Sequence, residues 1–220
     1  MIYKLGPDNS YDRIRIAGIG GQGVKYAGVL FGHVAIQAGF HAAQIVVYNP
    51  AMRGGLIYTD ITVATLPIVS PYFEVPEILC LMNDKVWSSL AKDVNPQTLI
   101  IIDSDVINPL DLGLDESMQT NLVEIPISST ATEVGGTANI VLIGYLSGQY
   151  NFLTIENTQS IDNAIETHNY KKFLQMELDL LRIEPSAFQS AVEELSPMRY
   201  RESNMKSFNA GLKLFQKSIG

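Results

Sequence analysis

A glycine-rich turn near the N-terminus constrains the fold of this chain more than any other feature. The turn follows a short apolar run, Arg13 to Ala17, and precedes a stretch from Val24 to about Ala38 that suits a helix. Gly18, Gly20 and Gly23 have the G-x-G-x-x-G spacing of a dinucleotide-binding turn. Such glycines permit a sharp turn and a close approach of a ligand to the backbone, and the N-terminus of the following helix attracts anions. The sequence therefore predicts a strand–turn–helix unit that could receive an anion.

The composition predicts a folded protein and excludes some classes of function. The chain has 220 residues, of which 46% are hydrophobic and 17% charged, so it can bury a sizeable core. Its formal net charge is −8 and it has no long basic run, which argues against nucleic-acid binding as its main activity. Residues Met1 to Tyr11 do not resemble a signal peptide, and no stretch reads as a membrane span. We therefore expect a cytoplasmic protein with no membrane partner.

The single cysteine limits the cofactors that this chain can hold. Cys80 cannot form an internal disulfide, and alone it cannot hold an iron–sulfur cluster or a structural zinc ion. It lies in the apolar run Ile78 to Met82, so we expect it to be a buried core residue. His33, His41 and His168 have no Cys, Asp or Glu at metal-ligand spacing. We therefore predict neither a catalytic residue nor a metal site on this chain.

Strands alternate with helices along most of the sequence, which is typical of α/β folds. The apolar run Thr98 to Ile102 is typical of a parallel strand buried on both faces, whereas the alternation over Leu56 to Ala64 indicates an antiparallel edge strand or a hairpin. The predicted fold is one α/β domain over residues 1–220, with a Rossmann-like, mostly parallel sheet and flanking helices in residues 13–150 and a C-terminal helical appendage in residues 151–220.

Several helices are expected on either side of these strands. A long helix over Ser129 to Gln149 contains Gly135 and Gly136, a pair that indicates a break or a close approach. The other expected helices run over Asp84 to Asp93, from Thr154 onward, over Lys171 to Glu194 in two pieces split at Pro185, and over Ser203 to Ile219.

A nicotinamide cofactor would require an acidic residue at the end of the second strand, about 20 residues past the last glycine, to bind the ribose hydroxyls. That strand, Ala42 to Tyr48, is followed by Asn49 and Pro50, and no Asp or Glu occurs between Asp12 and Asp60. A free-standing NAD(P)-dependent oxidoreductase therefore remains only an alternative hypothesis.

An ordered set of motifs resembles the gamma subunit of the 2-oxoacid:ferredoxin oxidoreductases, the family of the pyruvate, 2-oxoglutarate and ketoisovalerate enzymes. The pairing of Gly-Gly-Gln-Gly with a later Arg-Gly-Gly is more specific than either motif alone. The matching pieces are Gly18-Ile-Gly-Gly-Gln-Gly-Val24, Tyr48-Asn-Pro-Ala-Met-Arg-Gly-Gly55, Ile101-Ile-Asp103, Ala131-Thr-Glu-Val-Gly135, Asn139-Ile-Val-Leu-Ile-Gly144, Leu153-Thr-Ile-Glu156 and Phe208-Asn-Ala-Gly-Leu212.

This resemblance implies a role inside a larger enzyme that makes acyl-CoA and CO2 from a 2-oxoacid and coenzyme A (CoA). It implies alpha and beta subunits, and a delta subunit if separate, as partners, with ferredoxin contacted indirectly. Thiamine diphosphate, Mg and iron–sulfur clusters would belong to those partners, and the chain alone would bind no cofactor and be inactive. Its own part would be structural, and it would help to shape the CoA channel.

Five residues are the candidate site for CoA or for a subunit interface. Gly20, Gly21, Gln22 and Gly23 form either a bare structural turn or a contact for an anion or CoA. Gln22 favours the contact, because a polar side chain at a turn apex has few internal partners. Arg53, in a glycine turn just beyond a strand, is interpreted as a ligand or interface contact rather than a solvated charge.

Overall fold

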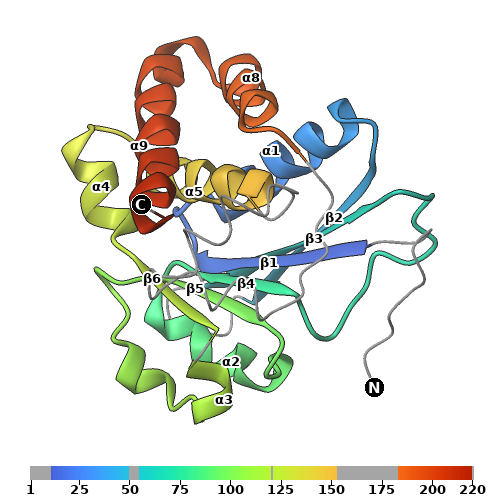
Figure 1. Ribbon diagram of the computed structural model, residues 1–220, viewed down its shortest axis with the longest axis vertical. Coiled ribbons are helices and arrows are strands. Elements are labelled where there is room, and N and C mark those ends of the chain that lie inside the picture. The colour runs from blue at the N-terminus through green and yellow to red at the C-terminus, as the bar shows by residue number, and fades with distance from the viewer. Residues whose placement is uncertain (1–10, 50–54, 120, 153–182, 220) are drawn as a thin grey trace.

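A six-stranded sheet forms the middle of the molecule, with helices on both of its faces (Figure 1). The computed structural model describes residues 11–49, 55–119, 121–152 and 183–219. The strand order across the sheet is β2-β3-β1-β4-β5-β6. The strands are β1 (Tyr11–Ile19), β2 (His41–Asn49), β3 (Leu56–Ala64), β4 (Ile78–Leu81), β5 (Leu99–Asp103) and β6 (Leu122–Ile125).

The sheet is mostly parallel, as predicted. Strands β1, β4, β5 and β6 pair in parallel, whereas β3 runs antiparallel to both of its neighbours, β1 and β2. The antiparallel strand predicted over Leu56 to Ala64 is therefore present as one half of a hairpin with β2. It does not lie at the edge, because β3 is inserted between β2 and β1, and β2 takes the edge position.

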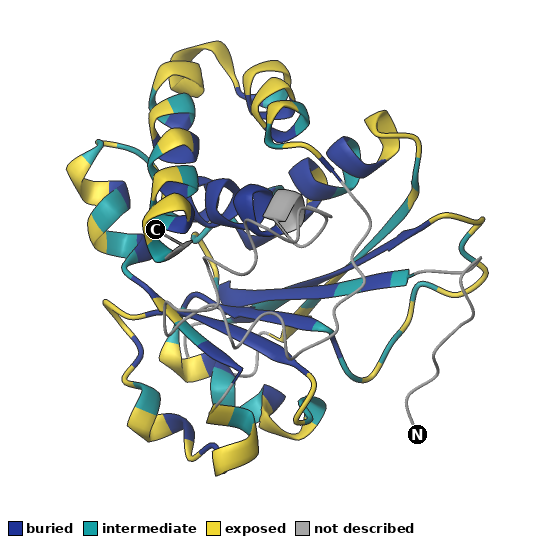
Figure 2. Cartoon of the chain, in the orientation of Figure 1, coloured by how far each residue is buried: buried dark blue, intermediate teal, exposed yellow. Residues whose placement is uncertain are grey.

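The two faces of the sheet carry separate apolar cores (Figure 2). Ile14 and Ile16 of β1 point into the larger core with α1, α5, α8 and α9, and Ala17 points into the smaller core beside α2. The predicted helix from Asp84 to Asp93 is divided into two 3-10 turns around α2. The helices are α1 (Val24–Gln37), α2 (Trp87–Leu90), α3 (Glu116–Gln119), α4 (Ile127–Glu133), α5 (Ala138–Phe152), α8 (Pro185–Leu195) and α9 (Arg201–Ile219).

The helix predicted over Ser129 to Gln149 is two helices, α4 and α5. The break lies at the glycine pair, where Gly135 has a φ of 64°, a left-handed conformation that favours glycine. Gly136 packs against Ser207 of α9. The helix expected from Thr154 onward lies outside the described residues, as does the first piece of the one expected over Lys171 to Glu194.

The last helix packs directly on the buried helix α5. Gly144 of α5 lies against the backbone carbonyl of Phe208, and Gly211 of α9 lies against the backbone carbonyl of Val141. Phe208 is fully buried in the same core as α1. The two helix backbones therefore touch at a pair of glycines, which leaves no room for side chains at the crossing.

We predict that Gly144→Ala lowers the free energy of unfolding by about 1–3 kcal/mol, because the new methyl group forces α5 and α9 apart. This loss exceeds the gain in helix propensity, which is up to about 1 kcal/mol. Urea unfolding followed by circular dichroism measures the change.

Gly32→Ala in α1 is the matched control. A Cβ at Gly32 would lie 4.0 Å from the Cβ of Ala42, an ordinary van der Waals contact. This substitution should leave the stability unchanged or raise it by up to about 1 kcal/mol. Equal losses in the two variants would contradict the close crossing of α5 and α9.

Candidate functional site

The predicted turn joins the end of β1 to the start of α1. Gly21 and Gly23 have φ values of 93° and 72°, so both adopt the left-handed conformation that favours glycine. Gly23 is the N-cap of α1, and no side chain of the described residues caps this 14-residue helix. The first N–H groups of α1 are thus left without a side-chain partner, as in helices that bind anions at their N-terminus.

Gln22 has two internal hydrogen-bond partners. The expectation from the sequence that its side chain has few internal partners is therefore wrong. Its Oε1 accepts a hydrogen bond from the backbone N–H of Ile19 at 2.8 Å. Its Nε2 donates to the backbone carbonyl of Met82, just beyond β4, also at 2.8 Å. The side chain therefore fixes the turn to the neighbouring strand, and its polarity needs no external ligand to explain it.

The last residue of the second glycine motif, Gly55, lies beside the glycine turn. The backbone N–H of Gly20 donates to the carbonyl of Gly55 at 3.2 Å, and Ile19 pairs with Leu56 in the β1–β3 ladder. Gly55 is the last residue of the Arg-Gly-Gly motif, so the end of that motif contacts the glycine turn. Arg53 itself lies outside the described residues.

Asn139 supports the turn from the other side. It stands in the first turn of α5, and its Nδ2 donates to the carbonyl of Gly23 at 3.3 Å. A buried polar side chain in an apolar helix needs a hydrogen-bond partner, and Asn139 finds one within this chain. A side chain at position 23 would collide with Asn139, which gives a second reason for glycine there.

The outer side of the turn is open. Gly20 and Gly21 are exposed, and a Cβ at either position would meet no atom of the described structure within 4 Å. Gly21 needs glycine for its φ value, but Gly20 does not have a positive φ. Packing within the described residues therefore does not explain glycine at position 20.

A pocket of about 410 Å³ lies beside this open side, between α1 and the start of β3. Its size is in the usual range for small-molecule sites. Its walls are mainly apolar, and exposed Lys25 in the first turn of α1 adds a positive charge. The lining residues are Ile19, Gly21, Gly23, Val24, Lys25, Tyr26, Val29 and Ile57.

Asp103 and Cys80 have structural roles. The Oδ1 of Asp103 accepts hydrogen bonds from the backbone N–H groups of Ile127 and Ser128 at 3.1 and 3.3 Å, so it caps α4. Cys80 is fully buried, as predicted, and burial raises the pKa of its thiol. Within the described ranges, no group of three or more His, Cys, Asp or Glu side chains is arranged to hold a metal ion. No helix in those ranges is long and apolar enough to cross a bilayer.

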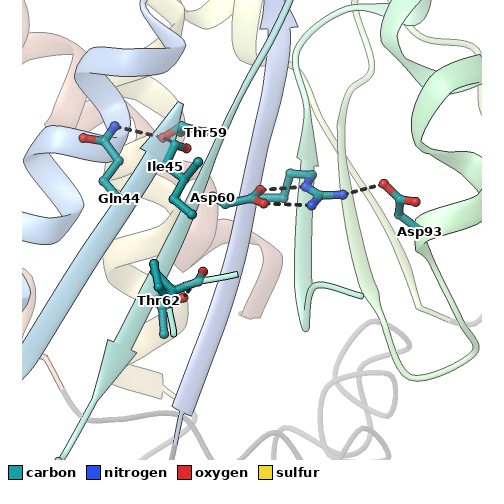
Figure 3. Close-up of polar contacts among 8 residues, drawn as sticks. Gln44, Ile45, Thr59, Asp60, Thr62 and Asp93 are labelled. Atoms are coloured by element: carbon teal, nitrogen blue, oxygen red, sulfur yellow. Dashed lines mark hydrogen bonds and ion pairs between the residues drawn. The ribbon is translucent and has the colours of Figure 1, made fainter. Parts of the chain in front are cut away.

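A buried charged cluster lies on the opposite face of the sheet from α1. Arg15 of β1 donates from Nε and Nη2 to the two carboxylate oxygens of Asp60 on β3, at 2.6 and 2.8 Å. Its Nη1 donates to Asp93 at 2.6 Å, so the guanidinium group lies between two carboxylates (Figure 3). The ring centroids of Tyr58 and Phe73 lie 4.5 and 5.4 Å from the guanidinium carbon.

This cluster is structural, because its charged groups bind one another. Arg15 is 3% exposed. Burial lowers the pKa of Arg15, but the hydrogen bonds and charge of Asp60 outweigh burial and raise it. Burial raises the pKa of Asp60, and Arg15 opposes that rise. Sequence reasoning missed the cluster, although an arginine between Ile14 and Ile16 signals that a carboxylate must lie opposite.

The fold and the turn define a class: a mixed α/β protein with a Rossmann-like glycine turn and an antiparallel strand inserted beside β1. Residues 13–183 match the family model described as "Pyruvate ferredoxin/flavodoxin oxidoreductase". That match spans more than half of the chain, so the chain belongs to this family. The resemblance found in the sequence motifs is confirmed.

Relatives found by sequence similarity include subunits of 2-oxoglutarate synthase. The chain is 29% identical over 158 residues to the 2-oxoglutarate synthase subunit KorC of Methanothermobacter marburgensis, covering 69% of this chain and 85% of the relative. It is 26% identical over 209 residues to the subunit of the same name from Methanothermobacter thermautotrophicus, covering 93% and 95%.

Solved structures share the fold. The keto/oxoacid ferredoxin oxidoreductase gamma subunit of Geobacter sulfurreducens superposes with a TM-score of 0.67 at 21% identity, covering 96% of this chain and 99% of that one. The 2-oxoglutarate:ferredoxin oxidoreductase of Magnetococcus marinus, solved with 2-oxoglutarate, coenzyme A and succinyl-CoA, gives 0.64 at 17% identity. That match covers 94% of this chain and 31% of the larger one.

We predict that Gln22→Ala lowers the free energy of unfolding by about 1–3 kcal/mol, because it leaves the Ile19 N–H and the Met82 carbonyl without their partner. Gln37→Ala, at the exposed end of α1, removes a hydrogen bond to Glu194 and should cost no more than about 0.5 kcal/mol. Thermal and urea unfolding compare the two. Equal stability of the two variants would contradict the structural role of Gln22.

Arg15→Met should cost about 3–5 kcal/mol at pH 7, because it leaves Asp60 buried without its counter-charge. The pKa of Asp60 then rises further in the folded state, so the folded state binds a proton more readily than the unfolded state. Stability relative to wild type should therefore recover as pH falls from 7 to 5. Urea unfolding at both pH values measures this.

Arg199→Met is the control for that experiment. Arg199 is exposed and contacts the ring of Tyr200, so its loss should change stability by no more than about 1 kcal/mol at either pH. An Arg15→Met defect that grows as the pH falls would contradict the assignment.

Proposed function

We propose that this chain is the gamma subunit of a thiamine-diphosphate-dependent 2-oxoacid:ferredoxin oxidoreductase. The complete enzyme converts a 2-oxoacid and CoA to acyl-CoA and CO2 and passes the electrons to ferredoxin. Family membership and the named relatives support the class of enzyme. In this proposal the chain has no catalytic residue and shapes the site where CoA enters.

The observation that carries the CoA role is the open side of the glycine turn beside the apolar pocket. The uncapped N-terminus of α1 and the ammonium group of Lys25 attract a phosphate or pyrophosphate group. Apolar side chains such as Val29 and Ile57 accommodate an uncharged part of the same ligand. Gly20 and Gly21 leave space for close approach to the backbone. We include Arg53 in the proposed site because Gly55, two residues later in the chain, is hydrogen-bonded to the turn.

The other cofactors do not fit this part of the chain, and we assign them to the partner subunits. The one cysteine is buried, and the described residues contain no metal-binding group of His, Cys, Asp or Glu side chains. Thiamine diphosphate with Mg would activate the 2-oxoacid in the partners, and iron–sulfur clusters would carry its electrons. Alpha and beta subunits, and a delta subunit where it is separate, are the proposed partners in the cytoplasm.

A nicotinamide cofactor is disfavoured by the strand order. In a dinucleotide-binding unit the acid that binds the ribose ends the strand next to β1. Here β3 lies between β1 and β2, so the end of β2 is two strand spacings from β1, about 10 Å. That end carries Asn49 and no acid.

Steady-state kinetics of the enzyme complex, purified under anaerobic conditions, test the CoA role. Lys25→Gln should raise KM for CoA about tenfold with little change in kcat, because it removes one charged contact to a phosphate group. Gly20→Val should do the same, because its side chain fills the open side of the turn without an internal clash.

Lys213→Gln, on the exposed face of α9, is the matched control and should leave KM unchanged. Unchanged KM in Lys25→Gln and Gly20→Val, together with weaker assembly, would instead assign the turn to a subunit interface. Recovery of the chain from its native host without a cluster-bearing, thiamine-binding partner would contradict the subunit proposal as a whole.

A further inference from the structure

The pairing of β1 with β4 ends one hydrogen bond early. Ala17 and Leu81 are the last residues in parallel register, and the backbone N–H of Met82 still donates to the carbonyl of Ala17 at 2.9 Å. In a parallel ladder, one residue bonds through its N–H and its carbonyl to two residues of the neighbouring strand that are two positions apart. The carbonyl of Met82 would therefore accept the next bond from the N–H of Ile19.

The side-chain amide of Gln22 takes the place of that bond. Its Oε1 accepts from the N–H of Ile19 and its Nε2 donates to the carbonyl of Met82, both at 2.8 Å. The amide offers the same donor and acceptor as a peptide group, so it joins the two strand ends in series. A Cβ at Gly18 would lie 2.5 Å from this Oε1, so glycine at that position leaves room for the amide.

This position is the topological switch point of the sheet. The chain leaves β1 into α1, on the face of the larger core, and it leaves β4 toward α2, on the opposite face. β1 and β4 are neighbours in the sheet. Open α/β sheets bind their ligands outside the carboxyl ends of the strands at such a point, and dinucleotides extend across it. Gln22 therefore lies where a ligand of that class would cross from β1 to β4.

We propose that Gln22 is a specificity-determining residue that blocks the switch point between β1 and β4. The inference rests on the proposed function, in which the glycine turn binds phosphate groups of CoA. The amide fills the space between the strand ends and uses the Ile19 N–H and the Met82 carbonyl, which could otherwise bind a sugar hydroxyl. A ligand that extends over β4, as a dinucleotide does, is excluded.

The same block gives the bound CoA a direction. A group attached beyond its two linked phosphates is directed over the open side of the turn, toward the pocket beside α1. The thiol of CoA lies at the end of such a group. In the proposed enzyme that thiol reacts in a partner subunit, so an arm directed away from the strand ends of this chain fits the proposed function.

Isothermal titration calorimetry of the enzyme complex, purified under anaerobic conditions, tests the inference with two probes. ADP has the adenosine and the two linked phosphates of CoA, and ADP-ribose adds a second sugar beyond them. Titrations repeated with saturating CoA identify the binding that CoA displaces. In the wild type, ADP-ribose should bind no more tightly than ADP, because Gln22 occupies the place of the second sugar.

Gln22→Ala should lower the dissociation constant of ADP-ribose, relative to that of ADP, at least about tenfold. It opens the switch point and frees the Ile19 N–H and the Met82 carbonyl for the sugar hydroxyls. Gln22→Met is the matched control, because it also removes both hydrogen bonds but fills a similar volume. The ratio of the two dissociation constants should therefore keep its wild-type value in Gln22→Met.

The outcomes separate this inference from the proposed function. If CoA displaces neither probe from the wild type, the CoA role of the turn fails and the inference fails with it. If CoA displaces ADP but the ratio is the same in Gln22→Ala and the wild type, only the inference is overturned. An equal change in Gln22→Met and Gln22→Ala also overturns it. So does a wild-type complex that binds ADP-ribose at least about tenfold more tightly than ADP, even if Gln22→Ala does not assemble.

Discussion

The burial of β1 in the middle of the sheet is the constraint on which the other elements depend. β1 has a neighbour on each side and an apolar core on each face, so every group on it must find its partner inside the protein. Arg15 is the residue of β1 whose burial costs the most free energy, because its side chain is charged. Its guanidinium group is buried only because β3 brings Asp60 directly opposite and Asp93 closes the other side. The β2–β3 hairpin is thus held against β1 by the ion pair of Arg15 and Asp60 as well as by the backbone pairing of β1 with β3.

The same strand positions the glycine turn. Because β1 is held on both sides, its last residue Ile19 lies beside the ends of β3 and β4, and Gln22 can reach back to Met82. Two further hydrogen bonds fix the turn, one between Asn139 and Gly23 and one between Gly55 and Gly20. The inner side of the turn is therefore fully engaged, and the outer side presents exposed glycines, a helix N-terminus and a pocket. In the proposed function, this side receives part of a ligand whose reacting end lies in a partner subunit.

The inserted strand separates this protein from a nicotinamide-binding domain that has the same glycine spacing. It moves β2 away from the turn, and it makes β2 an edge strand without charge. One change in strand order thus places the end of β2 away from the glycine turn and leaves β2 at the edge of the described sheet. The glycine motif alone does not predict this strand order, because the local spacing of glycines specifies the turn and not the strand that lies beside it.

Local patterns in the sequence determined the strands, the glycine turn, the break at Gly135 and Gly136 and the burial of Cys80, because hydrophobic period and glycine conformation act over a few residues. The motif set also determined the family. Only the tertiary structure decided the partners of Gln22 and Arg15 and the internal position of β3. Those features depend on groups 45 to 78 residues apart, whose meeting is set by the strand order. The contact of Gln22 with Met82 shows why an apparently free polar side chain cannot be assigned to a ligand before its neighbours are known.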